Sequence, residues 1–163
     1  MTCTRPDVAY AWSMTSRYQS NPGESHWRSV KNILKYLKRT KDYFLVYGGE
    51  EELSVRGYTD ASFQTDRDDF KSQSGYVFTL FGGAVSWKSF KQKTVADSTT
   101  EADYLAAAEA TKEALWIRKF ITELRVVPDA DKALDLYCDN SGAIAQAKHP
   151  KSTRNSVNQE RCA

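Results

Sequence analysis

The spacing of apolar residues predicts two helices in the first quarter of the chain. Residues 6–18 form the first, because Pro6 suits a first helical position. The second begins near Asn21, the expected cap, and Glu24 can complete a capping box. Its apolar stripe consists of Trp27, Val30, Ile33, Leu34 and Leu37. Lysine and arginine residues lie off this stripe, so the helix is amphipathic and basic, and its charges are either solvated or placed for phosphates.

Strand-like patterns follow the second helix. Residues 43–47 and 53–60 are predicted strands, and Asp60 lies at the end of the second one. Residues 75–81 and 84–88 are predicted strands as well, joined by two glycines in a connection typical of a hairpin.

A long helix and a further strand complete the pattern. The apolar pattern of residues 99–125 predicts one helix capped by Ser98. Small apolar residues around the first half of this helix suit close packing on a sheet. Residues 133–138 predict a core strand, and residues 141–148 predict a short helix that ends before Pro150. This order predicts an α/β fold with flanking helices and a mixed sheet, antiparallel in its hairpin strands and parallel after the helical crossover.

Composition restricts the class of protein. With 163 residues, of which 40% are hydrophobic, the chain can form one domain with a core. No apolar run approaches the ~20 residues of a membrane-spanning helix, and the first residues do not resemble a signal peptide. Cys3, Cys138 and Cys162 form no Cys-x-x-Cys pair, which argues against a disulfide scaffold or a zinc site. We expect an intracellular protein without a membrane partner.

The net charge of +2 conceals an uneven distribution. Residues 1–47 carry eight basic and three acidic residues, residues 48–139 carry eleven and seventeen, and residues 140–163 carry four and one. Either this is ordinary surface charge, or basic flanks contact a polyanion while the acidic middle holds metal ions.

Three acidic residues stand in distinctive positions. Asp60 and Asp139 each close a predicted strand, and Glu101 opens the long helix three residues after Ser98. Each has a simpler role open to it: a turn or cap for the aspartates, and a capping box for Glu101. Together they predict a metal site, because converging carboxylates repel one another unless a divalent cation lies between them. Two such cations can activate water and stabilise the leaving oxygen of a phosphodiester.

Other polar residues are weaker candidates. Asp103 is expected to face solvent. The hairpin region and the basic helix also offer side chains that could contact nucleic acid, although ordinary surface polarity explains them as well. These candidates are Lys71, Ser72, Ser74, Trp87, Lys88, Lys91, Lys93, Lys35, Lys38 and Arg39.

Several local motifs resemble one family. The segments YTDASFQTD, STTEADYLAAAEA and LYCDNSGAIAQAKHP are similar to the RNase H region of copia-type LTR-retrotransposon Pol polyproteins, especially those of plants. The opening TRPDVAYAW resembles the segment that joins reverse transcriptase to RNase H. The resemblance implies a helical connection over residues 1–42 and an RNase H-like domain over residues 43–150.

The same resemblance implies a function. It indicates a ribonuclease that cleaves the RNA strand of RNA–DNA hybrids with two Mg²⁺ or Mn²⁺ ions, held by Asp60, Glu101 and Asp139. Its partners would be the hybrid and the reverse-transcriptase part of the same polyprotein. In an active element the domain would work in a cytoplasmic virus-like particle or in the nucleus.

Residues 151–163 depart from the family pattern, which continues with the last part of the fold and often a fourth acidic position. We therefore expect an incomplete domain with a disordered tail and weakened cleavage. The alternatives are an inactive remnant that binds nucleic acid or protein, and a co-opted host or effector protein.

Overall fold

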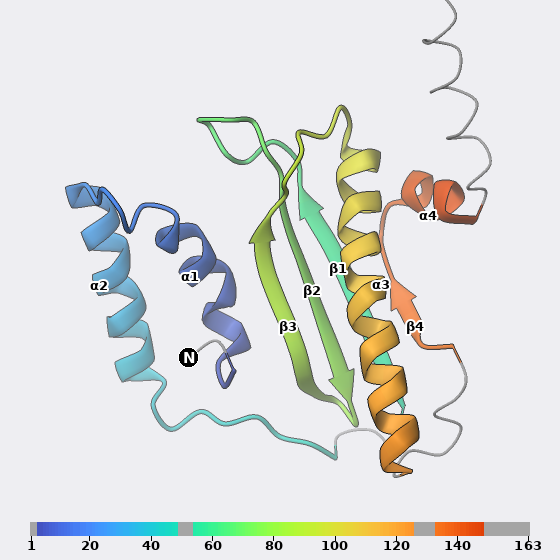
Figure 1. Ribbon diagram of the computed structural model, residues 1–163. Coiled ribbons are helices and arrows are strands. Elements are labelled where there is room, and N and C mark those ends of the chain that lie inside the picture. Colours follow the sequence, from blue (N-terminus) through green and yellow to red (C-terminus); the bar gives the residue numbers. More distant parts are fainter. Residues whose placement is uncertain (1–2, 49–53, 126–132, 149–163) are drawn as a thin grey trace, which may run out of the picture.

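The computed structural model describes residues 3–48, 54–125 and 133–148 (Figure 1). A short 3-10 helix, Pro6–Val8, leads into α1 (Ala9–Ser16), and α2 (Glu24–Arg39) follows. The sheet contains β1 (Val55–Ser62), β2 (Gln73–Leu80), β3 (Gly83–Lys91) and, after the long helix α3 (Thr99–Leu124), β4 (Asp135–Tyr137). The last described element is α4 (Ser141–Lys148).

The sheet is mixed, as the order of elements predicted. Its strand order is β3-β2-β1-β4. The pairs β1–β2 and β2–β3 are antiparallel, whereas β1 and β4 are parallel, with Gly57 opposite Leu136. The parallel pair arises because α3 carries the chain from one end of the sheet back to the other, as a crossover connection must. The predicted α/β class is confirmed.

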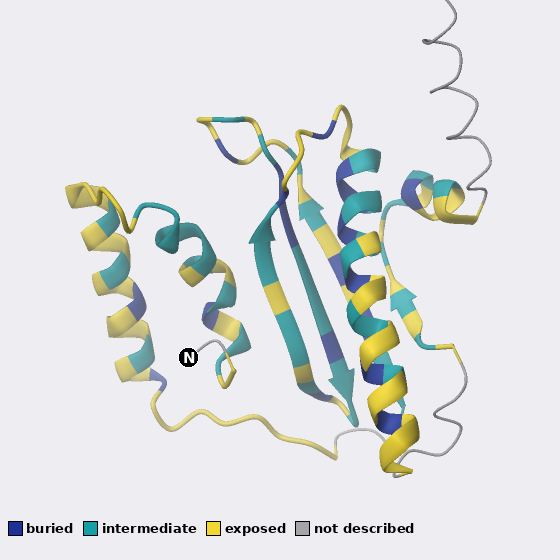
Figure 2. Ribbon diagram, in the orientation of Figure 1, coloured by how far each residue is buried: buried dark blue, intermediate teal, exposed yellow. Residues whose placement is uncertain are grey.

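The hydrophobic core lies between α3 and one face of the sheet, which we call the α3 face. Its buried residues are Val55, Phe78, Ala110, Ile117 and Ile121. In the first half of the helix, Ala102, Ala106 and Ala110 are almost fully buried, and Figure 2 shows the buried positions of α3 turned toward the sheet. The predicted run of small residues therefore has a structural reason, since alanine lets the helix approach the strands closely.

The opposite face of the sheet is held to α1 by polar contacts. The Gln73 side-chain amide donates hydrogen bonds to the hydroxyls of Ser13, 3.1 Å away, and Ser89, 2.7 Å away. Arg17 forms an ion pair with the buried carboxylate of Asp66 at 2.7 Å and also donates to the Gln73 side-chain oxygen. Lys91 of β3 pairs with the same carboxylate at 2.6 Å. We call Arg17, Asp66, Gln73 and Lys91 the polar latch.

The predicted N-cap of the second helix is corrected. The second helix begins at Glu24 with Gly23 as its N-cap, and the His26 ring nitrogen Nδ1 accepts a hydrogen bond from the Gly23 N–H at 2.9 Å, so Asn21 is not the cap. Of its apolar stripe only Ile33 is buried, whereas Trp27 is 55% exposed. Part of the stripe stays exposed because α2 packs mainly on the short helix α1 rather than on the sheet.

The segment of residues 43–47 is extended but forms no strand, and its side chains are mostly exposed. A strand requires a ladder of backbone hydrogen bonds, whereas the contact here with the β2–β3 hairpin is made by the Tyr47 ring against Gly83 and by a backbone bond from the Gly48 N–H to Phe81 O. The predictions for residues 53, 149–150 and 151–163 lie outside the described residues.

Gly57 leaves room for the aromatic core. A Cβ atom at this position would lie 2.5 Å from Cε1 of the fully buried Phe78 and 2.9 Å from Cδ1 of Leu136. We expect Gly57→Ala to lower the free energy of unfolding by about 1–3 kcal/mol, the usual cost of overpacking, in urea denaturation. Gly75→Ala is the control, because its nearest new neighbour is 3.4 Å away. Equal effects of the two substitutions would contradict this account.

The polar latch predicts an acid-sensitive contribution to stability. Hydrogen bonds from Lys91 and from the Asp68 N–H, with the charge of Arg17, hold the pKa of Asp66 at about 2, below its usual 3.8. A lowered pKa stabilises the fold above pH 4, and this stabilisation is lost as pH falls through about 2. We expect Asp66→Asn to cost about 2 kcal/mol at pH 6 and much less near pH 2, measured by urea unfolding across pH. The exposed Asp68, substituted by Asn, is the control, and a cost that stays constant with pH would count against the latch.

Candidate metal centre

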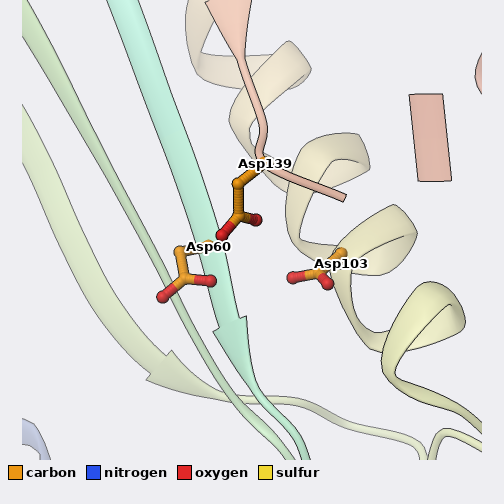
Figure 3. Close-up of side chains that lie close together, drawn as sticks. All are labelled: Asp60, Asp103 and Asp139. Atoms are coloured by element: carbon orange, nitrogen blue, oxygen red, sulfur yellow. The ribbon is translucent and has the colours of Figure 1, made fainter. Parts of the chain in front are cut away.

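Three aspartate carboxylates converge at one end of the sheet (Figure 3). Asp60 belongs to β1, Asp103 to the second turn of α3, and Asp139 follows β4 by two residues. One oxygen from each carboxylate lies within 4.8 Å of the other two. Asp60 and Asp139 are exposed, whereas Asp103 is only 6% exposed. We call these three residues the acidic cluster.

The parallel pairing of β1 and β4 sets two of the three positions. Tyr58 lies opposite Tyr137 in the register, and each acid lies two residues further along its strand direction. Because the side-chain period of a strand is two, Asp60 lies on the same face as Tyr58, and the chain beyond β4 brings Asp139 to the same level. The two tyrosine rings stack with centroids 5.3 Å apart, so this part of the register is well packed.

Asp103 is oriented by the residues that follow the other two acids. Its Oδ1 accepts a hydrogen bond from the backbone N–H of Ala61 at 3.0 Å. Its Oδ2 accepts one from the side-chain amide of Asn140 at 2.8 Å. The Asn140 Oδ1 in turn accepts from the Ala143 N–H in the first turn of α4. Each carboxylate oxygen of Asp103 still has acceptor capacity left, so these bonds orient the group without saturating it.

Glu101 lies outside the acidic cluster. Its Oε2 accepts a hydrogen bond from the Asp97 N–H at 2.7 Å, while its own N–H donates to the Ser98 hydroxyl. Glu101 thus helps to close the start of α3, close to the simpler of its two sequence interpretations, except that its side chain accepts from the Asp97 N–H rather than from that of the N-cap Ser98. The acids brought together therefore differ from the predicted set at one position, and the expectation that Asp103 faces solvent is wrong.

The sequence contained a signal for this difference. Residues two apart on a helix point about 200° apart, so Glu101 and Asp103 cannot both face the strand ends. A Glu three residues after a capping Ser turns back toward the helix start. That role directs the other acid, Asp103, toward the sheet.

The donor set suits a hard divalent cation. Carboxylate oxygens that share one Mg²⁺, Mn²⁺ or Ca²⁺ ion at about 2.0–2.6 Å lie at most roughly 4–5 Å apart, which matches the spacing in the acidic cluster. Exposed Asp60 and Asp139 leave the solvent side of such an ion open to further ligands. Asp60, Asp103 and Asp139 are thus the residues that could hold metal.

Several predicted nucleic-acid contacts are buried or paired. Ser72 and Ser74 are at most 1% exposed, and their hydroxyls accept hydrogen bonds from the Gln64 N–H and from the Gln92 side chain. Their hydroxyls are therefore not accessible, and this expectation is corrected. Lys71 pairs with Asp69, and Lys91 belongs to the polar latch.

The remaining candidates do not form one surface. Trp87 and Lys88 are neighbours on β3 and so point to opposite faces; the Lys88 ammonium lies 5.0 Å from the Phe90 ring centroid. Lys93 is exposed beyond β3, and Lys35, Lys38 and Arg39 are exposed on α2.

In the part of the chain that the structure describes, no helix is both long and apolar enough to span a membrane.

The capping assignment of Glu101 is testable. We expect Glu101→Ala to lower the free energy of unfolding by about 1 kcal/mol, since the hydrogen bond from the Asp97 N–H is lost while the Ser98 hydroxyl still caps the helix. Because this bond joins the Glu101 carboxylate to a backbone N–H and involves no cation, the difference should be the same with and without millimolar Mg²⁺, measured by urea denaturation. A cost that appears only with Mg²⁺ would instead make Glu101 a ligand.

Comparison with known proteins gives several Pol polyproteins among the relatives. The chain is 47% identical over 149 residues to the Retrovirus-related Pol polyprotein from transposon TNT 1-94 of Nicotiana tabacum. This match covers 91% of the chain but 11% of that protein. It is also 37% identical over 147 residues to the Retrovirus-related Pol polyproteins from transposons RE2 and RE1 of Arabidopsis thaliana. Each of these matches covers 90% of the chain and 10% of the polyprotein.

A shorter relative is also similar. The chain is 44% identical over 117 residues, 72% of its length, to the Secreted RxLR effector protein 161 of Plasmopara viticola, of which it covers 82%. No family model and no solved structure matches the chain. The similarity to Pol polyproteins extends over about nine tenths of the chain and shows the family to which the chain belongs. The chain belongs to the family of retrovirus-related Pol polyproteins of copia-type plant retrotransposons, and it spans about a tenth of their length.

Proposed function

We propose that this chain is a divalent-metal-dependent endoribonuclease domain of the RNase H type, which cleaves the RNA strand of RNA–DNA hybrids. The observation that carries the proposal is the acidic cluster, in which two adjacent strands and the long helix each supply one carboxylate. Membership of the Pol family supports it, because a Pol polyprotein that copies RNA into DNA produces such hybrids. The reverse-transcriptase part of the same polyprotein would be the natural partner.

Each acid has a distinct part in this proposal. Asp60 and Asp139, both exposed, would hold Mg²⁺ or Mn²⁺ from the sheet side and leave the solvent side for a scissile phosphate. The bound cations would lower the pKa of a water and stabilise charge on the departing oxygen. Asp103 would complete the donor set, and Asn140 acts as a positioning residue because it donates to the Asp103 carboxylate.

A groove beside the acidic cluster offers room for substrate. It has a volume of about 540 Å³, lies between the N-terminal helical segment and the face of the sheet opposite α3, and is lined by Asp60, Tyr58 and Trp87 among others. The stacked Tyr58 and Tyr137 rings are 42% and 49% exposed. Exposed aromatic side chains next to a phosphate-cleaving centre suit contacts with sugars or bases of the bound strand.

Cleavage of a labelled RNA–DNA hybrid tests the proposal. We expect cleavage with Mg²⁺ or Mn²⁺ and none in EDTA. Asp139→Asn and Asp103→Asn should each lower the rate at least about 100-fold, because a metal ligand is lost, whereas Glu101→Gln should stay within a few-fold of the wild-type rate.

Folding and metal binding are checked separately. Each variant's far-UV circular dichroism and melting temperature show whether it is folded, and the rise in melting temperature with Mn²⁺ reports binding to the native state. Loss of the Mn²⁺-induced rise in folded Asp139→Asn would support the site independently of turnover. Absence of hybrid cleavage by folded wild-type protein, or loss of cleavage in Glu101→Gln but not in Asp103→Asn, would reject the proposed assignment.

A further inference from the structure

An aromatic pocket lies between α1 and α2, and it shares no residue with the acidic cluster. Its volume is about 230 Å³, and its walls include Trp12, Tyr18, Pro22, His26 and Trp27. Trp12 and Trp27 are 40% and 55% exposed, so both indole rings are accessible to a ligand. Figure 1 shows that this helical pair lies on the far side of β3 from α3 and α4.

One wall of the pocket is pre-organised. The rings of Tyr18 and His26 are stacked, with centroids 4.0 Å apart and planes 8° from parallel. His26 is also fixed by the hydrogen bond from the Gly23 N–H to its Nδ1. The turn between the helices therefore supports flat aromatic surfaces, and a flat ring that enters the pocket need not order this wall first.

A row of basic side chains begins at the rim of the pocket. Trp27, Lys31 and Lys35 are spaced by four residues on α2, so they are neighbours along one stripe of the helix, and Lys38 continues the stripe. All three lysines are exposed. The acidic residue of α2, Glu24, forms its ion pair with Arg28 at 3.2 Å. The stripe from Trp27 to Lys38 extends about 16 Å at the helical rise.

The two features together specify the chemistry of the ligand. A pocket of this size and composition accepts one planar aromatic group, and stacking on aromatic side chains is how proteins bind unpaired bases. The exposed lysine row favours a ligand with negative charge repeated along its length, as the phosphates of a nucleic acid provide. A base inside a duplex is paired and stacked, and therefore it cannot enter the pocket.

We propose that the α1–α2 pair is a binding site for single-stranded nucleic acid, with one unpaired base inserted beside Trp12 and Trp27 and phosphates along Lys31, Lys35 and Lys38. The site needs no metal ion. It is independent of the proposed nuclease activity and holds for an inactive domain as well.

Fluorescence anisotropy tests this site on the full chain in EDTA. The probe is a labelled oligothymidylate of about twelve nucleotides, within the range of a single-strand binding module. We expect Trp27→Leu to weaken binding about tenfold, the equivalent of about 1.4 kcal/mol, and Trp27→Phe to retain most of the affinity because a stacking ring remains. The fold should survive, because the Trp27 side chain is half-exposed.

Matched controls separate stacking from general charge. Trp116→Leu removes an indole that is 59% exposed on α3, and it should leave binding unchanged. Lys35→Gln should reduce the slope of log affinity against log salt by about 0.7, whereas Trp27→Leu should leave that slope unchanged. Asp139→Asn should bind like wild type, which separates this site from the acidic cluster.

The outcomes are decisive in both directions. Tenfold loss in Trp27→Leu, normal binding in Trp116→Leu and weak binding of an abasic oligonucleotide of the same length would support the proposal. Equal affinity for the abasic oligonucleotide, equal effects of both tryptophan substitutions, or no binding by the folded wild-type chain would overturn it. Displacement of the oligonucleotide by a proline-rich peptide at equal concentration would assign the pocket to a peptide instead, and would also overturn it.

Discussion

The buried carboxylate of Asp103 is the interaction on which the arrangement of the acidic cluster depends. It accepts hydrogen bonds from the residue after Asp60 and from the residue after Asp139. A buried carboxylate without partners would be costly, so α3, β1 and the segment after β4 must stay together for all three polar groups to remain satisfied. The contact that orients one acid therefore also sets the distances between all three.

The two faces of the sheet are stabilised by different physics. On the α3 face, apolar residues such as Phe78 and Ile117 exclude water, and the attraction has no directional requirement. On the opposite face, the polar latch joins α1 to the sheet through charges and amide groups whose geometry must be met. The polar latch therefore makes part of this attachment depend on pH and salt, whereas the apolar packing on the α3 face does not.

Much of the fold could be predicted from the sequence, because its signals are local. The length of α3, the glycine-linked hairpin and the strand before Asp139 follow from periodicity and turn residues. The predictions that were wrong depended on how the elements pack together, which local patterns do not contain. Residues 43–47 have a strand-like composition but no partner strand, and Ser72 and Ser74 look like surface residues but are covered. The choice between Glu101 and Asp103 depends on how α3 is rotated against the sheet, and only the capping motif hinted at it.

Among the described strands, β4 lies at an edge of the sheet and pairs with β1 over three residues, and one of the three acids follows it by two residues. So short a pairing opens at low free-energy cost, and such edges exchange their amide hydrogens early. A cation bound between Asp60 and Asp139 would bridge the two strands, so that β4 could open only by releasing the ion. Occupancy of the acidic cluster and closure of this edge would then be thermodynamically linked, and the least secure strand of the sheet would be protected most when the site is loaded.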